Sequence, residues 1–138
     1  MLKKLLLFIF IMFISFSYGQ KMKDTDIYNG KALYMAMFDD KLNTTNKKAI
    51  GKDVMIFHNT LFETFEILFK DSNDKPSKMK LYRAPSRCDI CYTFENIPDK
   101  NSKVYYVSFM NNNLGLTLSV ISKDTKTLHG WVITDLSL

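Results

Sequence analysis

The stretch LGLTLSVI, residues 114–121, decides the fold class, because its apolar side chains alternate with glycine, threonine and serine. A two-residue repeat places alternate side chains on opposite faces and is typical of a half-buried β-strand, whereas a helix repeats every 3.6 residues. The polar residues 122–126 that follow favour a turn, and residues 127–133 resume extended character. This part of the chain is therefore predicted to form a hairpin.

The same two-residue repeat recurs along the chain. It predicts strands at 32–38 and 104–109, and a short apolar run predicts another at 54–57. The segment 104–109 precedes three asparagines at 111–113, which tolerate left-handed turn geometry. Together with the hairpin, this gives three C-terminal strands in meander order. We expect an all-β fold, or a β-rich α+β fold, built as a small antiparallel β-barrel or sandwich with six to eight strands in meander order.

Residues 60–70 fit two alternatives. Thr60 with Glu63 matches a helix capping box, and the apolar residues that follow fall on one helical stripe. The segment 65–69 also carries phenylalanine and isoleucine at alternate positions, and the polar turn at 71–77 leads into another alternating segment. We favour the hairpin, because aromatic and β-branched residues prefer strands.

Residues 1–19 are typical of a secretory signal peptide. Two lysines form a positive n-region, and the apolar run 5–16 is about a dozen residues long, whereas a membrane-spanning helix needs roughly twenty. Small residues occupy the −3 and −1 positions of a cleavage site before Gln20. The sequence predicts cleavage near Gly19/Gln20 and a secreted or periplasmic protein, with an uncleaved membrane anchor as the alternative.

Residues 20–138 are predicted to form a single β-rich domain, because no internal repeat and no Pro- or Gly-rich linker divides them. The polar stretch 41–51 lacks an apolar period, so we expect a surface loop or a short helix there. Basic residues between 75 and 87 stand among aspartates, which favours a solvated strand face. We expect no nucleic-acid partner and no stable membrane span after cleavage.

Cys88 and Cys91 are the only cysteines of the chain. Two cysteines at this spacing can form a disulfide, supply two zinc ligands or exchange electrons with another dithiol. A dithiol enzyme needs its first cysteine at a helix N-terminus, whereas the residues after this pair look extended. Zinc would need two further ligands, and the only histidines, His58 and His129, each stand alone. In an oxidising compartment we expect a disulfide, no metal and no cofactor.

The sequence contains no nucleophile elbow, no His-Glu-x-x-His helix and no Gly-rich phosphate loop. We therefore expect no catalytic residue and a non-catalytic binding or envelope-associated protein, with a periplasmic thiol-disulfide oxidoreductase as the alternative. The aromatic residues of the chain are more numerous than a thin sheet needs, so some could line a pocket for a small apolar ligand. The candidate ligand-binding residues are Trp131, His129 and Tyr105.

Overall fold

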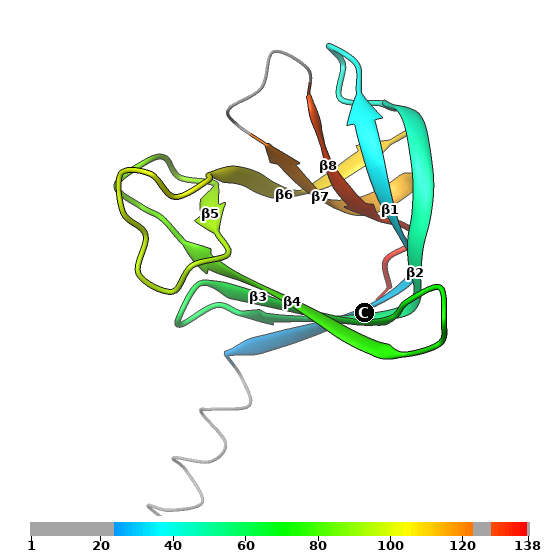
Figure 1. Ribbon diagram of the computed structural model, residues 1–138, viewed down its shortest axis with the longest axis horizontal. Coiled ribbons are helices and arrows are strands. Elements are labelled where there is room, and N and C mark those ends of the chain that lie inside the picture. Colours follow the sequence, from blue (N-terminus) through cyan, green and yellow to red (C-terminus); the bar gives the residue numbers. More distant parts are fainter. Residues whose placement is uncertain (1–23, 123–127, 138) are drawn as a thin grey trace, which may run out of the picture.

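A computed structural model describes residues 24–122 and 128–137 of the 138-residue chain. The predicted signal peptide, residues 1–19, and most of the predicted turn after residue 121 lie outside this range. The described residues are all-β, with eight strands and no helix (Figure 1). The strands are β1 (Thr25–Phe38), β2 (Thr44–Asn59), β3 (Thr64–Lys70), β4 (Pro76–Arg83), β5 (Cys91–Thr93), β6 (Tyr105–Asn112), β7 (Gly115–Ser122) and β8 (His129–Ile133).

The strands form one antiparallel sheet in meander order that closes into a ring. Each strand pairs with the next along the chain, and β1 also pairs with β8. Closing the sheet leaves no fully unpaired edge strand, which such folds otherwise have to protect. The predicted all-β meander is confirmed. No helix among the described residues is long and apolar enough to cross a membrane.

The main hydrophobic core fills the inner face of the ring. Because side chains alternate along a strand, Phe65 and Ile67 of β3 and Leu81 of β4 all point inward and are buried. The cluster draws on every strand of the ring: Leu33, Val54, Ile56, Phe65, Ile67, Leu81, Tyr92, Tyr105, Val107, Leu118, Val120, Ile133 and, after β8, Leu136.

A second, smaller core lies on the opposite face of β1, β7 and β8. It contains Ala36 and Phe38 of β1, Ile121 of β7 and Val132 of β8. The two cores together explain why the last six residues of β7 are all buried, on both faces of the strand.

The β6–β7 turn is tied to the start of β2 beside this second core. The backbone N–H of Thr44 donates to the side-chain oxygen of Asn113 at 3.2 Å, and the amide of Asn113 donates back to the carbonyl oxygen of Thr44 at 3.1 Å. This pair of hydrogen bonds joins two turns that are far apart in sequence. It holds the β1–β2 hairpin over the outer face of the sheet.

The predicted strands at 32–38, 54–57, 104–109 and 114–121 are confirmed, although the first two form parts of the longer strands β1 and β2. The prediction of a loop or short helix at 41–51 is wrong from Thr44 onward. This part of β2 pairs only with β1, since its pairing with β3 begins at Lys52. Most of its side chains are exposed, so no apolar period reveals the strand.

The hairpin alternative for 60–70 is confirmed, and the helical alternative is wrong. Asn59, the last residue of β2, accepts hydrogen bonds from the N–H groups of Leu61 and Phe62 at 3.0 and 2.8 Å, which forms a tight turn. Glu63 then takes the left-handed conformation with φ 51°, and β3 begins at Thr64. Thr60 and Glu63, the two residues that match a helix capping box, therefore both lie in this turn.

Candidate functional site

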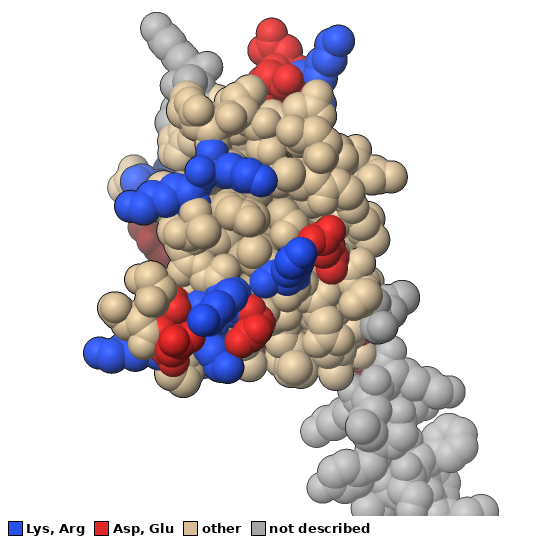
Figure 2. All heavy atoms as spheres, turned by 90° about the vertical axis from the view of Figure 1, so that its right-hand side faces the viewer, with Lys and Arg blue, Asp and Glu red and all other residues tan. Residues whose placement is uncertain are grey.

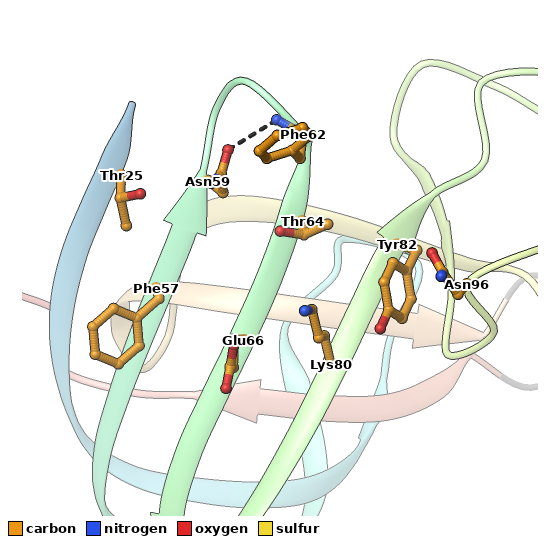
Figure 3. Close-up of a pocket in the computed structure, with 9 residues that line it drawn as sticks. All are labelled: Thr25, Phe57, Asn59, Phe62, Thr64, Glu66, Lys80, Tyr82 and Asn96. Carbon is orange, nitrogen blue, oxygen red and sulfur yellow. Dashed lines mark hydrogen bonds between the residues drawn. The ribbon is translucent and has the colours of Figure 1, made fainter. Parts of the chain in front are cut away.

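A groove of about 580 Å³ lies on the outer face of β2, β3 and β4 (Figure 3). Strand register builds it. Phe57, Glu66 and Lys80 are partners across the three strands, and the next outward row consists of Asn59, Thr64 and Tyr82. The described residues that line it are Thr25, Phe57, Asn59, Phe62, Thr64, Glu66, Lys80, Tyr82 and Asn96.

Three aromatic rings give the groove its apolar surface. Phe57 and Tyr82 are half-buried on β2 and β4, whereas Phe62 stands in the β2–β3 turn with 73% of its surface exposed. The hydrogen bond from its backbone N–H to Asn59, drawn in Figure 3, fixes the turn that presents the ring. Together with Phe57 and Tyr82, this exposed ring gives the groove an apolar contact surface.

The polar groups of the groove offer hydrogen bonds of both kinds. Glu66 accepts, the ammonium of Lys80 donates and the amide of Asn96 does both, whereas Asn59, whose oxygen already accepts two hydrogen bonds in the turn, offers its amide N–H groups. Glu66 also lies 3.7 Å from the Nζ of Lys78, and Lys80 lies 5.4 Å from the centre of the Tyr82 ring. Such exposed contacts are weak, so both charged groups can turn to a ligand at little cost.

Among the described residues that line the groove, Glu66 is the one carboxylate. Its neighbours in the groove are aromatic, amide, hydroxyl and ammonium side chains. The groove therefore offers a bound molecule aromatic and hydrogen-bonding contacts.

Charges on β2, β3 and β4 and in the turns between them are mixed. In the lower half of Figure 2, basic and acidic side chains lie next to each other. Lys52 pairs with Asp74 at 2.7 Å, which raises the pKa of the lysine and lowers that of the carboxyl through their hydrogen bond and mutual attraction. In the basic stretch 75–87, Arg83 lies 3.5 Å from Glu63.

The three residues predicted to bind a ligand lie elsewhere, on the inner face of the sheet. The ring centres of Trp131 and Tyr105 are 5.5 Å apart, and Phe94 meets both rings edge-on. Tyr105 belongs to the main core, and Trp131 packs against it. His129 is exposed on the same face of β8 as Trp131. The structure thus brings the two aromatic residues together, and a ligand-binding role for all three stays a prediction.

The predicted disulfide between Cys88 and Cys91 is confirmed, with their Cα atoms 5.1 Å apart. It lies where the chain turns from β4 into β5, and Cys91 is fully buried against Ala84 and Val104. Residues 85–90 form turns and no helix. The helix N-terminus that activates the thiol of many dithiol enzymes is therefore missing at this pair.

A second aromatic group surrounds His58 on the inner face of β2. The imidazole stacks on Phe65 with ring centres 4.3 Å apart, and Phe109 approaches both rings. Burial lowers the pKa of His58, while the carboxylates of Asp26 and Glu63 act in the opposite direction. Within the described ranges, no group of three or more His, Cys, Asp or Glu residues is placed to hold a metal ion.

No pattern in the sequence marks the groove as a unit, because its residues come from strands, a turn and a loop between positions 25 and 96. In the sequence, Phe62 lies close to the polar turn residues Asn59, Thr60 and Glu63, and this position could have indicated an exposed ring. Comparison with known proteins found no matching family model, curated protein or solved structure.

Proposed function

We propose that this chain is a secreted or periplasmic, non-catalytic binding protein, and that the groove on β2–β4 holds a sugar unit of an envelope or extracellular glycan. The observation that carries the proposal is the exposed ring of Phe62 at a groove that combines aromatic surface with hydrogen-bonding side chains. The proposal rests on two grounds, which are the predicted export of the chain and the residues that line the groove.

A sugar suits the groove better than a purely apolar molecule does. Beyond the three aromatic residues, the described residues of the lining are all polar or charged, and none of them is aliphatic. The flat C–H face of a pyranose ring packs on an aromatic face, and its hydroxyls need donors and acceptors at the edge. The inner face of the ring, in contrast, already packs into one cluster of apolar side chains.

The test is a microarray of bacterial polysaccharides and oligosaccharides, followed by calorimetric titration of the best binder with purified protein. Phe62→Ala removes the exposed ring and should weaken binding about two- to tenfold, since an aromatic contact contributes roughly 0.5–1.5 kcal/mol. Leu61→Ala is the matched control: Leu61 is the preceding residue, is 64% exposed and does not line the groove.

The proposal requires a saccharide that binds the wild-type and the Leu61→Ala protein equally and Phe62→Ala more weakly. If no saccharide on the array binds, or if both substitutions weaken binding to the same extent, the groove is not a sugar site. An insulin-reduction assay on the same sample tests the alternative function, in which Cys88 and Cys91 act as a thiol-disulfide oxidoreductase.

A further inference from the structure

Two methionines and one histidine lie on the paired strands β1 and β8, which run side by side (Figure 1). Met35 is the register partner of Trp131, and Met37 is the register partner of His129. Directly opposed residues of an antiparallel pair point to the same face, as do residues two apart on one strand. All four side chains therefore share the inner face of the sheet.

These spacings allow the side chains to contact one bound ion together. Opposed residues have Cβ atoms about 5 Å apart, and positions two apart on a strand are separated by about 6.7 Å. The flexible methionine side chain spans such gaps easily. Two thioether sulfurs and one imidazole nitrogen can thus reach a common point above β1 and β8.

Both methionines are unusually accessible for apolar side chains. Met35 is 50% exposed and Met37 is 37% exposed, and together with His129 they line a surface pocket of about 340 Å³. The amide nitrogen of Asn46 lies 3.9 Å from the sulfur of Met37. These methionines are on the side of the sheet that forms the main core, yet they remain open to solvent at its end.

The donor set selects the class of ion. Thioether and imidazole ligands favour Cu(I), whereas Ca²⁺ and Mg²⁺ need oxygen ligands, and the described residues that line this pocket include no carboxylate. Lys48, the register partner of Met35, also lines it, and its charge repels a divalent ion more strongly than a monovalent one. The ammonium of Lys47 is held 4.8 Å from the centre of the Tyr34 ring, on the opposite face of β1.

From this placement we infer that Met35, Met37 and His129 form a binding site for Cu(I). The disulfide keeps both cysteines of the chain out of competition for the ion. Trp131, beside Met35 on the same face, can present its ring to the bound cation, since a cation is attracted to an aromatic face. The site is on the inner face of the sheet and does not depend on a sugar in the groove of β2–β4.

Trp131 also provides the readout, because it is the only tryptophan of the chain. The experiment titrates oxidised protein anaerobically with Cu(I) in competition with a chromophoric Cu(I) chelator, and in parallel with silver nitrate as a redox-inert analogue. We expect one equivalent of either ion to bind and to change the fluorescence of Trp131. Zn²⁺ should bind at least about 100-fold more weakly, since Zn²⁺ prefers thiolate, imidazole and carboxylate ligands.

Substitutions separate the proposed ligands from other methionines. Met35→Leu with Met37→Leu should weaken Cu(I) binding by about 100-fold or more, because even a supporting residue of a metal site typically contributes 10–100-fold. His129→Gln should weaken it by about tenfold or more. Met55→Leu is the matched control, since Met55 is 39% exposed but lies on the outer face of β2.

Methionine-to-leucine changes conserve volume and leave the fold intact, which near-ultraviolet circular dichroism verifies. A second measurement needs no variant: in the methyl spectrum of ¹³C-methionine-labelled protein, silver should shift Met35 and Met37 and leave Met55 unmoved. Equal Cu(I) affinity in the wild type and the double variant would overturn the site. So would methyl shifts at Met55 alone, or no binding of either ion.

Discussion

The two faces of the β3–β4 hairpin differ in what their side chains contact. On the inner face, Ile67 and Leu81 are fully buried in the main core. On the outer face, Glu66 and Lys80, each next to one of those residues in sequence, line the open groove. The same strands therefore supply the core on one side and a contact surface on the other, so that changes on the two faces should have separable effects.

The largest effect is expected on the inner face. Leu81→Ala should lower the free energy of unfolding by about 2–5 kcal/mol, because it removes a fully buried side chain and leaves a cavity. Urea denaturation followed by the fluorescence of Trp131 measures this loss. If that variant does not fold, Ile67→Val gives the graded version, with an expected loss of about 0.5–1.5 kcal/mol.

The outer face provides the control for this prediction. Lys80→Ala should change the free energy of unfolding by no more than about 0.5 kcal/mol, because exposed positions away from special contacts tolerate substitution. A loss at Lys80 as large as that at Leu81 would mean that the two faces are not separable.

The disulfide should have an intermediate effect. Replacing Cys88 and Cys91 together by serine should lower the free energy of unfolding by about 2 kcal/mol or less, since cross-linking so short a loop removes little chain entropy. The same urea experiment checks it, with Ser86→Ala in the preceding turn as the control. A loss well above the Leu81→Ala value would mean that the bond organises the fold as a whole.

How far the sequence predicts this fold depends on whether each strand has one buried face. Residues 65–69 and 114–121 pack on the core and show the two-residue repeat, so their strands could be predicted. Residues 44–50 form a strand that pairs on one side only and whose side chains are mostly exposed, so the sequence reads there as a polar loop. Pairing through backbone atoms leaves no trace in the side-chain pattern.

The groove was harder to predict than the strands. An outward phenylalanine such as Phe57 looks like a core residue in the sequence, because alternation does not reveal which face is inside. Asn96 lies in a loop and lines the groove only because the fold brings this loop next to β4, which its position in the sequence does not reveal. Trp131 and Tyr105 were singled out for their chemistry, and the structure gives both a packing role.

The smallest effect concerns pH. Because burial lowers the pKa of His58 below its ordinary value of 6.5, the folded protein keeps the imidazole neutral while the unfolded chain takes up a proton. The unfolded state then binds more protons, so the free energy of unfolding should fall as the pH drops through 6.5 toward the lowered folded-state pKa. Stability should be unaffected by this group above that range.

Denaturation curves of the wild type and His58→Gln between pH 7.5 and about 5 measure this effect. The variant should show a flatter dependence on pH, because its side chain does not titrate. Identical slopes for the two proteins would show that His58 is as solvated as an outer-face residue, and would weaken the distinction between the faces.

The most direct test of the account is to measure glycan affinity and unfolding free energy together on Phe62→Ala. We predict that the affinity for the best-binding saccharide falls about two- to tenfold while the free energy of unfolding stays within about 0.5 kcal/mol of the wild type. Unchanged affinity, or a loss of stability comparable to that of Leu81→Ala, would contradict the assignment of binding to the outer face.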